Sequence, residues 1–322
     1  MNATVVAALA LAPVPFFKGM SLTSWSADAL ASPECATSIA RMSQIYVDTV
    51  AVNVWEFQDE ETSTAIAPDY TRYSSTTLSL RTAIRRIKAK GMKVMLKPNV
   101  DLRNGAWRGT IVPSEAWFAS YRKFINKYAQ LAAQEKVEVL SVGCEFNKAQ
   151  TWEGHWRDVA KGVRAVYPGL LTYSSNHDSY SAVKWWDAMD FVGIDAYFVL
   201  TSKTNPSPAE LTASVNRVAD GIAAWRSASG ILKPVAFNEA GYRSEDGANM
   251  HPWDWSSNGA LDLREQKDCY QALYETMRKR SWWRGVFWWN WETDPQAGGL
   301  ESNGFTPQNK PAEWLLKVLY FF

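Results

Sequence analysis

Cysteine and histidine are scarce in this chain of 322 residues, which contains three of each. An odd and sparse set of cysteines is not a disulfide framework, and the chain has no Cys-x-x-Cys pair of the kind that binds zinc. The three histidines are far apart in sequence, which argues against a metal site. We therefore expect neither a metal nor any other cofactor.

A strong charge of either sign is also missing, because 34 Lys and Arg residues nearly balance 33 Asp and Glu residues. The formal net charge of +1 and the lack of a long basic run give no electrostatic basis for binding nucleic acid or an anionic membrane. Neither G-x-G-x-x-G nor a P-loop motif occurs, which argues against a nucleotide-binding protein.

The N-terminal segment, residues 1–17, is predicted to be either an ordered arm or the remnant of a signal peptide. It is apolar and contains Ala8-Leu9-Ala10, which resembles a cleavage site, but no Lys or Arg precedes Lys18. The apolar run is too short to span a bilayer. Secretion is compatible with this segment without being established by it. We expect residues 18–322 to form one catalytic domain and the protein to be a monomer.

Tryptophan, in contrast, is abundant, with 17 residues. An excess of aromatic side chains in a nearly neutral protein suggests flat apolar platforms, and sugar rings are one class of ligand that stacks on such platforms. Core packing is the alternative explanation for many of these residues.

Strand-like and helix-like segments alternate along the chain, and the order is strictly strand then helix. This order predicts an α/β fold of the (β/α)8 TIM-barrel type, whereas an open doubly wound sheet would have fewer strands and a glycine-rich first turn. The predicted strands are residues 18–22, 49–54, 93–100, 138–145, 170–176, 191–197, 234–241 and 285–291. The predicted helices are residues 33–46, 76–90, 113–135, 155–167, 208–228, 261–280 and 312–322, with a short helical piece at 182–188.

Two of the predicted strands deliver a glutamate at their C-terminal end. Alternation along the strand predicts that Glu239 shares a face with Val235 and Phe237, and that Glu145 shares a face with the residues two, four and six positions before it. In a barrel these strand ends meet at the face where catalytic groups gather. A charge buried there must be paired, hydrogen-bonded or neutralised.

Most glycoside hydrolases use two carboxyl groups that face one cavity. One group stays protonated and releases the leaving oxygen, while the other is ionised and attacks the sugar or activates water. Burial and mutual repulsion can separate the pKa values of two glutamates in this way. The alternative is that Glu145 and Glu239 are simply paired with Lys or Arg at the top of the barrel.

The two segments resemble those of a known family. Val142-Gly143-Cys144-Glu145 resembles the Gly-x-Glu acid/base motif of glycoside hydrolase family 113, within the clan-A glycoside hydrolases. The segment from Phe237 to Ser244 is similar to the nucleophile segment of that family, and the tryptophan-rich strand from Gly285 to Glu292 is similar too. The resemblance extends from Lys18 to the C-terminus.

This resemblance implies a retaining endo-β-1,4-mannanase with Glu145 as the acid/base and Glu239 as the nucleophile. One position departs from many clan-A families, in which an asparagine that holds the 2-hydroxyl of the substrate precedes the acid/base. Cys144 stands there in this sequence, so the partner of that hydroxyl is left open.

Further candidates for substrate binding lie at or near the predicted strand ends. Tyr197 is expected either to hydrogen-bond to the nucleophile or to pack as a core aromatic. Lys97 is expected either to bind a substrate hydroxyl or to pair with Asp195. Trp289 or Trp291 of the eighth strand is a candidate platform under the reacting sugar; alternation allows both to face inward, and at least one of them is expected in the core. The predicted substrate-binding residues are Trp25, Asn53, Lys97, Asn99, Asn176, Tyr197, Trp289 and Trp291.

Three other functions are compatible with this sequence to different degrees. A retaining enzyme on another β-linked glycan, such as glucan, xylan or galactan, would share the barrel and the two glutamates. A non-catalytic carbohydrate-binding barrel would use its tryptophans alone. A metal-dependent hydrolase is disfavoured by the few histidines. We expect the partner to be a β-linked oligo- or polysaccharide, with mannan first.

Overall fold

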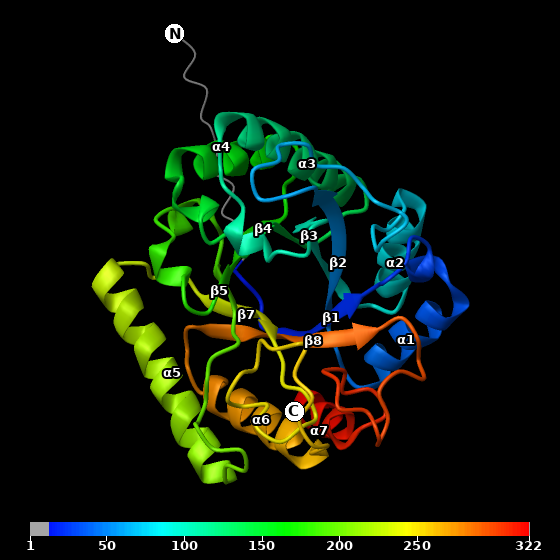
Figure 1. The fold of residues 1–322 in the computed structure, drawn as a ribbon, viewed down its shortest axis with the longest axis vertical. Helices are drawn as coiled ribbons and strands as arrows, with labels where there is room; N and C mark the ends of the chain where they lie inside the picture. The colour runs from blue at the N-terminus through cyan, green and yellow to red at the C-terminus, as the bar shows by residue number, and fades with distance from the viewer. Residues whose placement is uncertain (1–12, 322) are drawn as a thin grey trace.

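Eight parallel strands close into a ring in the computed structural model, which describes residues 13–321 (Figure 1). Each strand pairs with its neighbour in sequence, and the eighth pairs with the first, so the predicted (β/α)8 barrel is confirmed. Most of the predicted N-terminal arm or signal remnant lies outside the described residues. The strands are β1 Phe17–Thr23, β2 Thr49–Gln58, β3 Lys93–Leu102, β4 Val139–Cys144, β5 Leu170–Asn176, β6 Val192–Asp195, β7 Val235–Ala240 and β8 Trp283–Glu292.

Helices form an outer layer around the strands (Figure 1). The chain between β5 and β6 instead makes two short 3-10 turns, Tyr180–Ala182 and Trp186–Ala188, where the sequence predicted a short helical piece. The helices are α1 Pro33–Gln44, α2 Thr77–Ala89, α3 Glu115–Gln134, α4 Glu153–Arg164, α5 Pro208–Ser229, α6 Leu263–Met277 and α7 Pro311–Phe321.

Local sequence signals determine where several helices begin and end. The Ser32 hydroxyl accepts a hydrogen bond from the Cys35 amide, so Ser32 caps α1. Ser207 and Glu210 form a capping box at the start of α5, and Gly230 ends that helix in the left-handed conformation. The predicted start of α3 at residue 113 was two residues early, because Ser114 caps the helix and Glu115 begins it.

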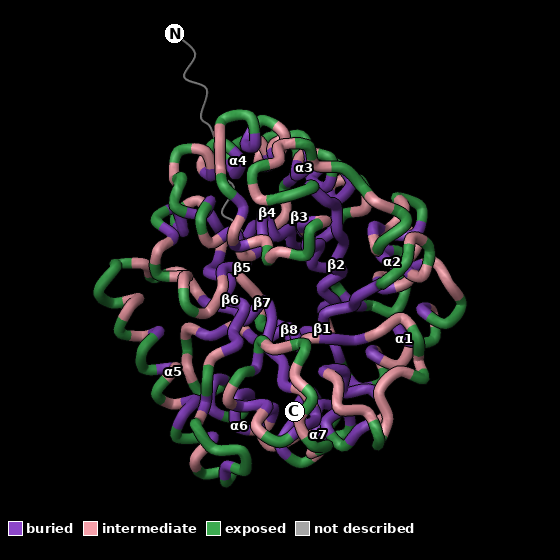
Figure 2. The backbone as a smooth tube through the Cα atoms, in the orientation of Figure 1, coloured by how far each residue is buried: buried purple, intermediate pink, exposed green. Residues whose placement is uncertain are grey.

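The hydrophobic core has an inner and an outer part. The outer part lies between the strands and the helices, and buried residues accordingly follow the strands and the inner sides of the helices (Figure 2). The inner part fills the ring itself, and most of its members come from early positions of their strands: Phe17, Ala51, Met95, Val139, Phe191, Ala236 and Phe287. It closes the N-terminal end of the barrel, which leaves the C-terminal end to carry the polar side chains.

Strand β6 illustrates how tightly the interior is filled. A Cβ atom on Gly193 would lie 2.4 Å from the Tyr173 carbonyl oxygen and 2.1 Å from the Asn238 amide nitrogen, so only glycine fits. Val192 and Ile194 belong to the outer core, and Asp195 is buried inside the ring. The side chains of this strand therefore alternate between the outer core and the interior of the ring.

Strands β2 and β3 are longer than predicted, because their ladder continues from Thr49 and Lys93 to Gln58 and Leu102. The polar residues that suggested a loop are satisfied within the strand. Glu56 pairs with Lys127 and accepts a hydrogen bond from Tyr128, and Gln58 accepts one from the Trp117 indole at 2.8 Å.

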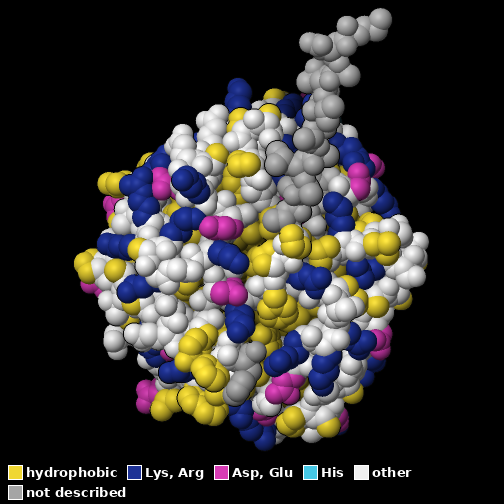
Figure 3. Space-filling view, turned by 180° about the vertical axis from the view of Figure 1, so that it is seen from behind, with side chains coloured by type: hydrophobic (Ala, Val, Ile, Leu, Met, Phe, Trp, Pro, Cys, Tyr) yellow, Lys and Arg dark blue, Asp and Glu magenta, His cyan; other side chains and the backbone are white. Residues whose placement is uncertain are grey.

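The surface seen from behind carries hydrophobic side chains in patches among Lys and Arg side chains (Figure 3). Residues one to three positions before a strand contribute exposed apolar side chains at the N-terminal end of the barrel, among them Phe16, Tyr46 and Leu232. Within residues 13–321, no helix combines the length and the apolar character needed to cross a membrane.

Candidate active site

A bulge in β7 turns Glu239 into the mouth of the barrel. The register of β7 shifts by one residue against β6 between Ile194 and Asp195, so Asp195 pairs with Glu239. The expectation that Glu239 shares a face with Val235 and Phe237 was wrong, because both of those side chains pack in the outer core. The extra residue of the bulge breaks the two-residue period and re-aims the carboxylate.

A second shift in register, between Ser141 and Cys144, does the same for β4. A Cβ atom on Gly143 would meet the side chains of Trp156 and Tyr173 in the outer core, whereas the Cys144 thiol lies inside the ring. The predicted common face of Val139, Ser141, Gly143 and Glu145 is therefore wrong.

Glu145 follows this bulge with a φ of +55°, a conformation that is uncommon for a residue other than glycine. Backbone of this kind recurs at functional sites, where the surrounding structure holds it in place. The turn leaves the Glu145 carboxyl partly exposed at the mouth.

The Lys97 ammonium group is the centre of the polar network beneath the mouth. It is fully buried, lies 3.1 Å from Asp195 Oδ2 and also donates to Glu239 Oε1. Burial by itself lowers the pKa of Lys97, but the Asp195 and Glu239 carboxylates outweigh that effect and raise this pKa above its ordinary value. Of the two roles predicted for Lys97, the structure shows the ion pair with Asp195.

Tyr197 completes the surroundings of Glu239. Its hydroxyl donates a hydrogen bond of 2.7 Å to Glu239 Oε2, the oxygen that Lys97 does not contact. The predicted contact between Tyr197 and the proposed nucleophile is thus present. The two donors compensate the negative charge of the carboxylate and fix its orientation.

Glu145 has a different environment. Burial raises the pKa of Glu145, and the nearby Glu239 charge raises it further, whereas Arg108, Lys97 and a hydrogen bond from Trp107 lower it. The Trp107 indole nitrogen lies 3.4 Å from Glu145 Oε2. Together these effects raise the pKa of Glu145, which favours its protonated form, whereas Glu239 is ion-paired with Lys97. An acid and a nucleophile require two environments that differ in this way.

Arg108 was not anticipated from the sequence. It lies just beyond β3, lies 2.7 Å from Asp101, donates to Asn99 Oδ1 at 2.9 Å and approaches the Cys144 thiol at 3.2 Å. Asn99 therefore orients Arg108. The adjacent Trp-Arg pair in the loop after β3 was the available signal for both Trp107 and Arg108.

The two tryptophans predicted as possible sugar platforms on β8 have different surroundings, and at least one of them lies in the core, as expected. Trp291 is fully buried outside the ring, where its indole donates to Ser38 of α1 and Arg41 lies over its ring. We therefore no longer expect Trp291 to contact a sugar. A register shift against β1 between Met20 and Leu22 accounts for the change of face. Trp289 remains partly exposed.

The predicted asparagines occupy different levels of the barrel. Asn53 is fully buried inside the ring, where its amide donates to the Ala51 carbonyl, so it lies below the mouth. Asn176 is partly exposed at the end of β5 and its Oδ1 accepts from the His177 amide at 2.8 Å. The His177 ring in turn stacks on Trp253 at 5.4 Å between centroids.

Comparisons with known proteins agree with this geometry. The sequence model of Glycoside Hydrolase Family 113 matches residues 21–310. The chain belongs to glycoside hydrolase family 113. It is therefore a glycoside hydrolase, and the resemblance noted for the two glutamate segments is confirmed at the level of the family. No curated protein sequence matches the chain at the significance level applied.

Solved structures of family 113 are similar over almost the whole barrel. One described as a GH113 β-1,4-mannanase complex is 29% identical, covers 95% of this chain and 99% of its own, and has a TM-score of 0.85. AaManA, a GH113 β-mannanase from Alicyclobacillus acidocaldarius solved in complex with ManMIm, is 27% identical with a TM-score of 0.84, covering 95% of this chain and 97% of its own. A family 5 mannosidase from Rhizomucor miehei shares the fold at 10% identity, with a TM-score of 0.65 and coverage of 95% and 93%.

Two groups of possible metal ligands occur in the described part of this family 113 chain. In the first, Cys144, Glu145 and Asp195 approach one another, but Lys97 already pairs with Asp195, and burial raises the pKa of the Cys144 thiol so that it stays neutral. In the second, Asp262 caps α6 and Glu265 accepts hydrogen bonds from backbone amides. Asp195, Asp262 and Glu265 therefore already have partners within the protein, whereas Asp246, the third residue of the second group, is exposed.

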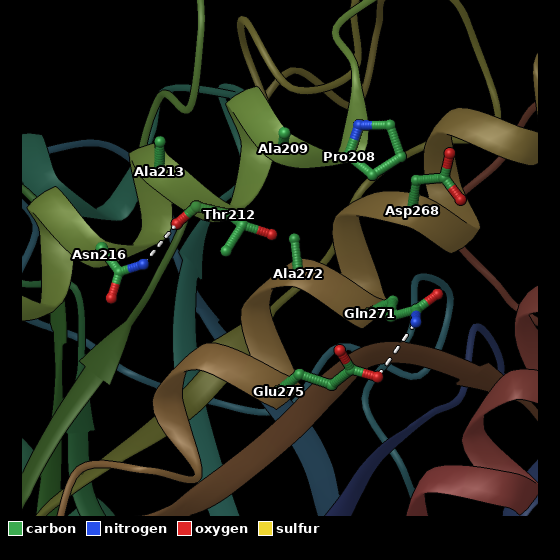
Figure 4. A pocket seen from close by; sticks show the side chains of 9 residues that line it. All are labelled: Pro208, Ala209, Thr212, Ala213, Asn216, Asp268, Gln271, Ala272 and Glu275. Carbon is green, nitrogen blue, oxygen red and sulfur yellow. Dashed lines mark hydrogen bonds between the residues drawn. The ribbon is translucent and has the colours of Figure 1, made fainter.

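A surface groove between α5 and α6 is separate from these strand ends (Figure 4). Alanines line part of it, and Gln271 donates to Glu275 along its side. It lies on the outer helices and contains none of the residues that surround Glu145 and Glu239. The groove therefore serves as a reference region for variants outside the site.

The replacement Lys97→Met tests the buried network. It leaves Asp195 and Glu239 without their cation, so we expect a loss of about 3–5 kcal/mol in the free energy of unfolding. Burial already raises the pKa of Asp195, and loss of the Lys97 charge raises it further, so the loss of stability is larger at pH 8 than at pH 5, where protonation relieves it. Chemical denaturation at both pH values measures this difference.

Lys123→Met, on an exposed position of α3, is the matched control and should change stability little. Combining Lys97→Met with Asp195→Asn should restore part of the lost stability, because one unpaired charge is removed. Equal losses for the Lys97 and Lys123 variants would contradict the network.

Proposed function

We propose that this family 113 chain is a retaining endo-β-1,4-mannanase. Glu239 attacks the anomeric carbon while Glu145 protonates the departing oxygen, and Glu145 then activates the water that releases the sugar. The observation that carries the proposal is that two glutamates, delivered by β4 and β7 to one mouth, have opposite environments.

The surroundings of each glutamate suit its proposed step. Glu239 receives two donors, Lys97 and Tyr197, which hold the carboxylate for attack and stabilise it again when it departs as a leaving group. Glu145 is held by one neutral donor, Trp107, and burial favours its protonated form. The two carboxyl groups should lie roughly 5–5.5 Å apart in a retaining enzyme.

The identity of the similar solved structures supports mannan as the substrate, since two of them are described as GH113 β-1,4-mannanases or β-mannanases. Aromatic side chains on opposite sides of the mouth support action within a chain. Trp25 lies beyond β1, and Trp253 stacks on His177 beyond β5. Sugar units on both sides of the cleaved bond could therefore be bound.

The variant Glu239→Gln tests the nucleophile. We expect hydrolysis of mannohexaose to fall by about 10³-fold or more, because the amide cannot form the glycosyl intermediate. Reducing-sugar release measures the rate, and circular dichroism checks the fold. Glu275→Gln, in the groove between α5 and α6, should retain the wild-type rate. Substantial turnover by the Glu239 variant would rule the assignment out.

The variant Trp107→Phe tests the acid. The Trp107 hydrogen bond lowers the pKa of Glu145, so its removal should raise that pKa. Glu145 must be protonated in the free enzyme, and kcat/KM therefore falls as pH rises through its pKa. We expect the alkaline limb of the kcat/KM profile on mannohexaose to move to higher pH. An unmoved limb, or a move to lower pH, would contradict the role of Trp107.

A further inference from the structure

Trp25 is the exposed member of an ordered aromatic group at the rim of the barrel. Half of its side-chain surface is exposed, at 51%, although it packs face to face on Trp55 at 5.5 Å with an angle of 28° between the rings. The Tyr73 ring meets both indoles edge-on. One face of Trp25 is thus covered by protein.

The edge of the Trp25 indole is fixed as well. Its nitrogen donates to Glu292 Oε2 at 2.8 Å, and the other oxygen of Glu292 accepts from the Asn290 amide at 2.7 Å. Asn290 also donates to Thr23, which ties the end of β8 to the end of β1. Trp25 is therefore held on one ring face and at its indole nitrogen. These contacts keep its remaining exposed surface in a defined orientation.

The position of this platform relative to the two glutamates defines which sugar it meets. Glu145 follows β4, so the departing part of the substrate lies on the β4 side, where Glu145 protonates it. Trp25 and Glu292 lie where β8 and β1 end, and β8 is opposite β4 in a ring of eight strands. The retained part of the substrate therefore extends toward Trp25.

We propose that Trp25 forms a binding subsite for the second sugar on the retained side of the cleaved bond, next to the sugar that reacts. This inference rests on the proposed function. The ligand is the apolar face of a β-linked hexopyranose, and the Glu292 carboxylate beside the indole is an acceptor for its hydroxyl groups. Trp55 and Tyr73 support the platform without contacting the sugar.

Cleavage of mannopentaose in ¹⁸O-labelled water tests this subsite, since the label marks the new reducing end of the retained fragment. In Trp25→Ala every binding mode with two or more sugars on the retained side is weakened. We expect kcat/KM to fall about tenfold or more, and labelled mannose to rise relative to labelled mannobiose and mannotriose. Trp25→Phe keeps an aromatic face and should stay close to the wild-type pattern.

Trp314→Ala is the control, because Trp314 is also exposed, at 68%, but lies on the outer helix α7. It should leave both the rate and the label pattern unchanged, and thermal unfolding of all variants separates binding effects from loss of fold. An unchanged pattern in Trp25→Ala would overturn the inference, as would a shift toward longer labelled fragments, which would place Trp25 on the departing side.

The failure of the proposed function would be recognisable in the same experiment. If the wild-type protein binds mannopentaose without cleaving it, calorimetric titration measures the affinity for mannopentaose instead of the labelled products. A loss of about tenfold in the affinity of Trp25→Ala then supports the platform, and an unchanged affinity overturns it. A wild-type protein that neither binds nor cleaves mannopentaose would contradict both proposals.

Discussion

One buried ammonium group holds together the part of the barrel on which the site depends. Hydrogen bonds of the parallel ladder connect each strand only with its neighbours, whereas Lys97 reaches from β3 across the interior to Asp195 on β6 and Glu239 on β7. Burying three ionisable groups is costly unless their charges and hydrogen bonds are compensated. The network meets that requirement and at the same time fixes the carboxylate proposed as the nucleophile.

The order of the elements and the two glutamates were predictable from the sequence because both depend on local patterns. Apolar periodicity and capping residues such as Ser32 mark the strands and helices, and the C-terminal ends of parallel strands share one face. The faces of Glu145, Glu239 and Trp291 were not predictable in the same way. The direction of each of these side chains depends on an extra residue that shifts the pairing of its strand with the neighbouring strand. The alternation of side chains along a single strand does not reveal such a shift.

Loop residues that contact the site were also missed, because their contacts join positions that are far apart in the sequence. Trp107 reaches Glu145 across 38 positions of sequence, and Tyr73 reaches Asp101 across 28. Such contacts arise from the closed fold. The abundance of tryptophan was the only hint in composition. Packing explains many of these residues, among them Trp117, Trp156 and Trp288, while half-exposed ones such as Trp25, Trp107 and Trp253 come from loops after β1, β3 and β7.

In the proposed mechanism, one acid and one nucleophile at the mouth of the barrel act on the same glycosidic bond. The most direct test of this mechanism is the anomeric configuration of the first product, followed by proton NMR during hydrolysis of mannohexaose by the wild-type protein. Two successive displacements predict that the β-anomer forms first and that the α-anomer appears only later by mutarotation. Initial formation of the α-anomer would show a single displacement by water and would contradict the role of Glu239 as nucleophile.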